Sequence, residues 1–158
     1  MPVTLSVKGL VETQRKLEQA IADLHGAPMK DGMRKATLLV EGDAKRLAPV
    51  DQGLLRASIA SELRTEGVGG RDVVGVVGSA KSYAAVMEVG SKPHWPPISA
   101  LQAWADRHGV SAFVVARAIA RRGTKPRLYL QTAFEQNQQK IEDLIGQAVS
   151  GIVDKANQ

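Results

Sequence analysis

The side chains that could carry chemistry in this 158-residue chain are few and scattered. Its three histidines, His25, His94 and His108, lie far apart, and none belongs to a His-x3-His or His-Glu-x-x-His motif that would place two imidazoles on one metal ion. The chain has no cysteine, so thiolate ligands and thiolate nucleophiles are absent. The sequence therefore predicts neither a metal centre nor a cofactor.

Other signatures of catalysis are missing as well. Ser58 and Ser79 lack the Gly-x-Ser-x-Gly context of a nucleophile elbow. The glycine-rich GVGGRD (67–72) lacks the Gly-Lys-Ser/Thr ending of a phosphate loop, and a β-hairpin turn accounts for it better. We therefore expect no enzyme, and a small hydrolase is the weakest of the hypotheses.

The composition predicts one folded domain, residues 1–158. Hydrophobic residues make up 44% of the chain, and the 21 basic and 16 acidic residues give a net charge of +5. A moderate positive charge favours an acidic partner, such as a phosphate backbone, without requiring one. No window approaches about 18 uninterrupted apolar residues, and the N-terminus lacks the pattern of a secretory signal, so we expect no membrane contact.

Hydrophobic periodicity predicts mostly helices around a small sheet, an α+β fold. Alternation in 3–10 predicts a strand, and the 3.6-residue period predicts two N-terminal helices that pair with each other. The other expected elements are a hairpin, a helical hairpin inserted at about 96–123 and a C-terminal helix of nearly thirty residues. Their ranges are 11–24 and 29–47 for the N-terminal helices, 55–62 and 73–79 for the hairpin strands, and 98–108 and 112–122 for the inserted helices.

The stretch RLAPVDQGLLRASI (46–59) marks the change from helix to sheet. Pro49 lacks an amide hydrogen and pushes Ala48 out of helical geometry, so the preceding helix must end there. Asp51 and Gly53 supply turn chemistry, and the alternation from Leu55 onward predicts a strand.

The two inserted helices also fit a helix-turn-helix, the motif of many DNA-binding proteins. Gly109 takes the turn position, Ala105 the small inner position and Val115 the buried position of the second helix. The face that would read bases is poor in the side chains that contact base edges. It presents Ser111, Ala112, Phe113, Ala116 and Arg117. A packed helical hairpin is favoured, and a DNA-binding protein remains the alternative.

Three segments, taken together, resemble a known family. They are AKRLAPVDQGLLRASI (44–59), VVGVVGSAKSYAAVMEVGS (73–91) and GTKPRLYLQTAFEQ (123–136). In this order and spacing they are similar to the tail-component family of long-tailed bacteriophages named after the tenth gene product of a lambdoid coliphage. Gln52 stands where the family usually has Thr or Ser, and Tyr129 where Phe is more frequent. The inserted hairpin resembles an insertion carried by a subset of members.

The resemblance implies a structural virion protein of the head-tail interface, made in the host cytoplasm, that completes or terminates the tail and joins it to the head connector. Its expected partners are further copies of itself in a ring around the DNA channel, with a hexamer as one form. The tail tube protein and the head-side connector or stopper proteins are the others. Non-specific contact with genomic DNA is also expected.

Three groups of residues are the candidate sites. We expect the junction of helix, strand and loop to be fixed by Pro49, Asp51, Gly53, Leu55, Arg56, Tyr83, Glu88 and Gly90. The candidates for contacts between proteins are His94, Trp95, Trp104, Tyr129 and Phe134. The candidates for phosphate contacts are Arg117, Arg121, Arg122, Lys125 and Arg127.

Overall fold

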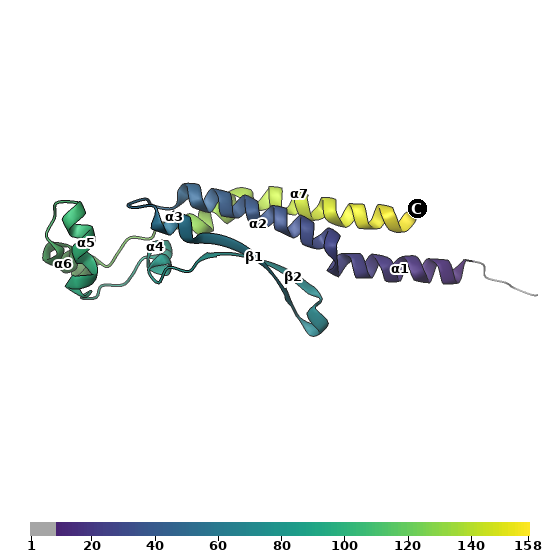
Figure 1. The fold of residues 1–158 in the computed structure, drawn as a ribbon, viewed down its shortest axis with the longest axis horizontal. Coiled ribbons are helices and arrows are strands. Elements are labelled where there is room, and N and C mark those ends of the chain that lie inside the picture. Colours follow the sequence, from purple (N-terminus) through teal and green to yellow (C-terminus); the bar gives the residue numbers. More distant parts are fainter. Residues whose placement is uncertain (1–8) are drawn as a thin grey trace, which may run out of the picture. The chain divides into compact units, whose positions relative to one another are not determined.

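Helices and one two-stranded antiparallel sheet make up the computed structural model, which describes residues 9–158 (Figure 1). The expected α+β class is confirmed. The helices are α1 (Leu10–His25), α2 (Ala27–Leu47), α3 (Leu54–Ser58), α4 (Ala84–Val89), α5 (Ile98–Arg107), α6 (Ala112–Arg122) and α7 (Tyr129–Asn157). Strands β1 (Ile59–Glu66) and β2 (Asp72–Ser79) are joined through the 3-10 turn η1 (Val68–Gly70). Of the strand expected at 3–10, residues 3–8 lie outside the described residues and Leu10 belongs to α1.

The chain divides into two units. Unit 1 comprises residues 1–42, 60–77 and 136–158, and unit 2 comprises 43–59 and 78–135. Unit 1 therefore holds α1, most of α2, most of the sheet and most of α7, whereas unit 2 holds α3 to α6. The assignment of the whole chain to one domain stays a prediction.

In unit 1, α2 and α7 lie side by side and antiparallel (Figure 1). Gly32 of α2 faces Ala148 of α7, and a Cβ placed on Gly32 would lie 2.8 Å from the Ala148 Cβ. Small residues at this crossing let the two helices approach closely. Nearer the C-terminus of α7, Lys155 Nζ donates to Asp23 Oδ2 at 2.9 Å, and this hydrogen bond lowers the pKa of Asp23.

The expected pairing of the two N-terminal helices is wrong. α1 and α2 follow each other end to end, with Gly26 between them (Figure 1). Gly26 ends α1, and its amide donates to the carbonyl of Asp23 at 3.2 Å. The apolar partner of α2 is α7, which begins 82 residues after α2 ends, so the local period could not identify it.

The sheet also packs on α2. Gly75 of β2 lies so close to Thr37 and Met33 that a Cβ at this position would collide with the Thr37 methyl group. Ser61 of β1 donates a hydrogen bond to the Glu41 carboxylate. At the far end of the hairpin, His25 Nδ1 donates to the Arg71 carbonyl at 2.6 Å. The hairpin is therefore held against the helical layer at both of its ends.

The strand expected from residue 55 begins only at Ile59. Leu54–Ser58 forms the short helix α3, in which the Ala57 amide donates to the Gly53 carbonyl at 2.9 Å and Ser58 Oγ to the Leu55 carbonyl at 2.8 Å. Leu55 and Ile59 are both buried. Their spacing of four fits one helical turn as well as two strand repeats, which is why alternation was misleading here.

In unit 2, α5 and α6 pack against each other with the turn at Gly109 that the sequence predicted. The residues buried in these helices are the alanines Ala105, Ala112 and Ala116. Trp104 is 39% exposed and stacks on the His108 ring at 4.2 Å between centroids. α4 is a short helix that ends at Gly90, whose amide donates to the Val86 carbonyl.

The contact of Gly75 with α2 gives a stability prediction. Gly75→Ala should lower the free energy of unfolding by about 1–3 kcal/mol, because the added methyl group overpacks the contact with Thr37. The measurement is thermal unfolding by circular dichroism. Gly78→Ala on the same strand is the matched control, since nothing lies within 4 Å of its added Cβ. Equal melting temperatures for the two variants would contradict the packing assigned to Gly75.

Candidate functional site

The two ends of the inserted hairpin meet in unit 2. Ser91 and Thr124 form an antiparallel bridge in which each backbone amide donates to the other residue's carbonyl, at 3.1 and 3.2 Å. Their side chains meet too, with Thr124 Oγ1 donating to Ser91 Oγ at 3.0 Å. The 32 residues between them therefore begin and end at one point of unit 2.

Glycines make this close approach feasible. Gly90 and Gly123, which precede the two bridge residues, both have positive φ, +74° and +69°. A Cβ on Gly90 would collide with the Thr124 carbonyl, and one on Gly123 with the Ser91 carbonyl. Any other residue at either position meets both the φ penalty and a clash with backbone. The expected junction residue Gly90 thus has a specific physical role at the base of the insertion.

Glu88 joins this base to the beginning of α7. Its Oε2 accepts the Leu130 amide and its Oε1 the Gln131 amide, both at 2.9 Å. These amides belong to the first turn of α7, where backbone donors have no partner within the helix and a negative charge is favourable. The carboxylate thus caps a helix more than forty residues later in the sequence.

The backbone carbonyls at the end of α4 also bind the segment that directly precedes α7. The Arg127 amide donates to the carbonyls of Met87 and Glu88, at 3.0 and 3.1 Å, and the Leu128 amide to the Glu88 carbonyl at 3.0 Å. The end of α4 and the beginning of α7 therefore share one set of hydrogen bonds. Two of the three resembling segments, 73–91 and 123–136, meet in this set.

Tyr129, a candidate for contacts between proteins, is instead a core residue. Its side chain is 1% exposed, and its hydroxyl has no hydrogen-bond partner among the described residues. Desolvation, followed by the charges of Glu88 and Tyr83, raises the pKa of the phenol. A residue so deeply buried cannot meet another protein, and the expectation for Tyr129 is corrected.

Asp51 pairs with the inserted hairpin, not with Arg56. Arg107 Nη2 and Nε both donate to the Asp51 carboxylate, the latter at 3.4 Å, and His108 Nε2 lies 3.9 Å from it. The hydrogen bond from Arg107 lowers the pKa of Asp51. Both partners are about one third exposed, at 34% and 36%, so salt screens the pair. The Asp51 turn is thereby tied to the end of α5.

The other junction residues lie around the same break. Leu55 is buried, and Ser58 Oγ lies 2.7 Å from Ser79 Oγ, which joins the first resembling segment to the second. Pro49 follows the end of α2 and Gly53 precedes α3, as the turn chemistry predicted. Arg56 and Tyr83 are exposed, and their side chains make no hydrogen bond to another described residue. A structural role for these two stays a prediction.

The remaining contact candidates are on the surface. Trp95 and Phe134 are each 53% exposed, and His94 and Trp104 are also exposed. The Trp95 ring meets Phe113 of α6 edge-on, with centroids 5.6 Å apart. Phe113 was not among the contact candidates, although the sequence had placed it on the face of the second inserted helix that would read bases. Ser91, Gly123 and Thr124 were missed too, and the Gly-Ser and Gly-Thr pairs at the ends of the insertion are the signal.

The five candidates for phosphate contacts are all exposed and make no ion pair with a described residue. They lie on α6 and directly after it: Arg117, Arg121, Arg122, Lys125 and Arg127. The structure disfavours the helix-turn-helix alternative, because Ala112 and Ala116 of its base-reading face are buried. Phe113, a third member of that face, contacts Trp95. α6 is therefore not arranged to read base edges.

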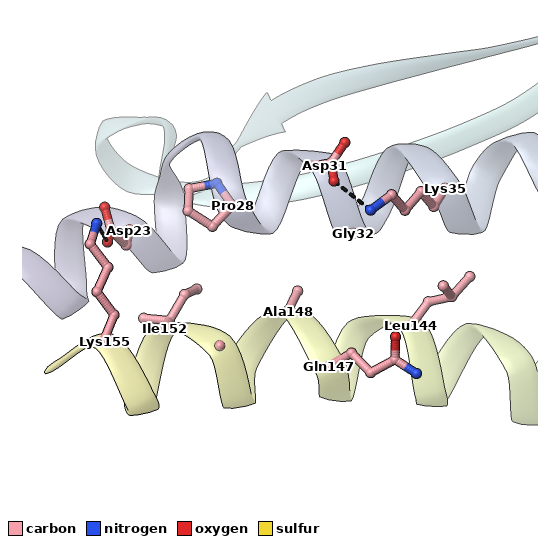
Figure 2. Close-up of a pocket in the computed structure, with 11 residues that line it drawn as sticks. Asp23, Pro28, Asp31, Gly32, Lys35, Leu144, Gln147, Ala148, Ile152 and Lys155 are labelled. Atoms are coloured by element: carbon pink, nitrogen blue, oxygen red, sulfur yellow. Dashed lines mark hydrogen bonds and ion pairs between the residues drawn. The ribbon is translucent and has the colours of Figure 1, made fainter. Parts of the chain in front are cut away.

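A groove of about 390 Å³ lies between α2 and α7 in unit 1 (Figure 2). Its charged side chains are already paired, Asp31 with Lys35 at 2.7 Å and Asp23 with Lys155 at 2.9 Å. Residues 9–158 contain no cluster of three or more histidines and carboxylates placed to hold a metal ion. Across the same residues, no helix is both long and apolar enough to cross a membrane. The groove shows no acid-base pair free for catalysis.

Comparison with known proteins gives one match. The sequence model of the family HK97-gp10_like, described as "Bacteriophage HK97-gp10, putative tail-component", matches residues 12–90. Neither the curated proteins nor the solved structures give a match. The matched range ends at Gly90, so it contains the Asp51 turn and Glu88 and stops where the inserted hairpin begins.

The capping role of Glu88 predicts a stability loss. Glu88→Ala should lower the free energy of unfolding by about 1–3 kcal/mol, because two charge-assisted hydrogen bonds to the first turn of α7 are lost. Chemical denaturation measures the change. The control is Glu135→Ala, which removes an exposed carboxylate of α7 itself. It should change the free energy of unfolding by less than about 0.5 kcal/mol. Equal losses in both variants would show that Glu88 is no cap.

The Asp51 pair predicts a pH-dependent effect. Its pKa is lowered in the folded protein, so the pair stabilises the fold above the unfolded-state pKa, and this stability is lost as the pH falls through the folded-state value. Asp51→Asn should therefore lower the melting temperature most above about pH 5, with the difference disappearing towards about pH 2. Asp106→Asn, beside Arg107 but bonded to Gln102, is the control. A difference independent of pH would contradict the ion pair.

Proposed function

Because the chain belongs to the HK97-gp10-like family of bacteriophage tail components, we propose that it is the structural protein that completes the tail at the head-tail interface. It assembles there as a ring of copies, with the tail tube protein on one side and the head-side connector or stopper on the other. The protein is made in the host cytoplasm and ends in the virion. Its work is to bind other proteins, not to catalyse a reaction.

The observation that carries this proposal is the exposure of the apolar side chains of α1. This 16-residue helix is amphipathic, yet the structure buries none of its residues. Glu12, Lys16 and Gln19 line a second hollow, between α1 and the end of α7, whereas the apolar stripe of α1 lies on another side of the helix. Its members are Leu10, Leu17 and Ile21, exposed by 66%, 61% and 49%. An isolated helix of this length is marginal in water, so the stripe needs a covering surface.

The core supports the same conclusion. Among the described residues, eight of the thirteen buried hydrophobic side chains are alanine, and twenty larger hydrophobic side chains are exposed. Single exposed apolar residues are normal, but a stripe on one helix together with aromatic side chains on the inserted hairpin is typical of contact surfaces. The subunit therefore presents apolar surface that neighbouring proteins can bury.

A ring requires two different surfaces that fit each other. In a closed heterologous assembly each copy contacts the next through a patch that differs from the patch contacting the previous copy. We assign the α1 stripe to the contact between copies. The hairpin surface around Trp95 and Phe113 lies outside the matched range, and we assign it to the partner in the tail or connector.

Assembly tests this function directly. The purified protein should form rings of several copies, seen by light scattering over a range of concentrations and by negative-stain microscopy. Leu17→Glu with Ile21→Glu should leave the helix content unchanged but yield single subunits, because two charges are placed on the stripe. Arg15→Gln with Ala22→Glu makes the same change of charge on the opposite side of α1 and should still form rings.

Position in the particle is the second readout. A gold label on a C-terminal tag should mark the joint between head and tail. Label along the tube or at the distal tip would contradict the proposed position, while the family assignment would remain. Rings that survive the α1 stripe variant would show that the copies meet through another surface.

A further inference from the structure

Charge is distributed unequally between the two units. Unit 2 contains eleven basic and five acidic residues, whereas unit 1 contains ten basic and eleven acidic ones. The positive charge of the chain is therefore a property of unit 2. Within that unit, the stretch 107–134 contains six basic residues and no acidic residue.

Five of these six cations form an unpaired group, here called the basic segment, 117–127. Arg107 is the exception, since it pairs with Asp51. The side chains of the basic segment are exposed, and none makes an ion pair with a described carboxylate. Exposed like charges repel one another when no counter-charge is near, so the arrangement costs some stability. An external anion would relieve that repulsion.

The backbone under the basic segment is held in place. Arg117 and Arg121 lie one turn apart on α6 and so share a face of the helix. Beyond α6, Thr124 is bridged to Ser91, and the Arg127 amide is bonded to the Met87 and Glu88 carbonyls. Lys125 and Arg127 therefore extend from a segment anchored on both sides. Such fixed placement lowers the entropic cost of binding a polyanion.

We propose that the basic segment of unit 2 binds duplex DNA through its phosphate backbone, without reading the base sequence. A uniformly negative partner fits this surface, because the stretch 107–134 contains only basic charges. Base readout is disfavoured because α6 contains no Asn or Gln and two alanines of the expected reading face are buried. The inference needs only one copy of the chain, so it stands independently of the ring.

The test is a fluorescence anisotropy titration of a 30-base-pair duplex of arbitrary sequence with the full-length protein at several salt concentrations. Five phosphate contacts predict a slope of log affinity against log salt of about −4.5, so that affinity falls about 500-fold between 50 and 200 mM salt. Arg117→Gln with Arg121→Gln and Arg122→Gln should reduce the magnitude of this slope by about 3. Lys125→Gln with Arg127→Gln should reduce it by about 2.

The control removes the same charge from unit 1. Arg15→Gln with Arg34→Gln and Arg71→Gln replaces three exposed arginines that form no ion pair with a described carboxylate, and it should leave the slope unchanged. Thermal unfolding checks that every variant is folded. Equal weakening in control and test variants would overturn the proposal, since net charge alone would then explain binding. It is also overturned by a preference of more than about tenfold for one sequence, or by polyglutamate competing as well as DNA, which would indicate an acidic protein partner.

Discussion

The arrangement of unit 2 depends on one carboxylate. Glu88 accepts two amides of the first turn of α7, while its own carbonyl and that of Met87 accept the amides just before that turn. Two chain segments separated by the whole insertion are thereby joined in one set of hydrogen bonds. The bridge between Ser91 and Thr124 lies directly beside it. There Gly90 closely approaches the Thr124 carbonyl, and Gly123 the Ser91 carbonyl. This set and the bridge together join the two ends of the insertion to the beginning of α7.

Much of the fold could be predicted because the apolar period of a helix is visible within a short stretch of sequence. The bounds of α2, α5, α6 and α7 follow from apolar periodicity and from proline and glycine at their ends. The start of β1 could not be predicted, since Leu55 and Ile59 are buried at a spacing that helix and strand share. The helix that packs on α2 could not be predicted either, because periodicity identifies an apolar face but not the segment that covers it.

The candidate site was predictable to a similar extent. Asp51, Glu88 and Gly90 were singled out by motif, and each has a definite contact in the structure. The partner of Asp51 could not be identified, however, because Arg107 lies fifty-six residues away in the sequence. Tyr129 was expected at a contact between proteins, but it is buried in the first turn of α7. Local sequence therefore identified which residues matter better than it identified what they touch.

The closed base of the insertion makes the hairpin an exchangeable part. Because the segment leaves and re-enters at the Ser91–Thr124 bridge, its length and content are decoupled from the hydrogen bonds that position α7. Chain insertions are tolerated best where their two ends are adjacent. The salt-screened pair of Asp51 with Arg107 is the one side-chain tie across this boundary described above, and its loss would cost little. A tail component built this way can acquire a new binding surface by recombination at Gly90 and Gly123, while the rest of the chain is inherited unchanged.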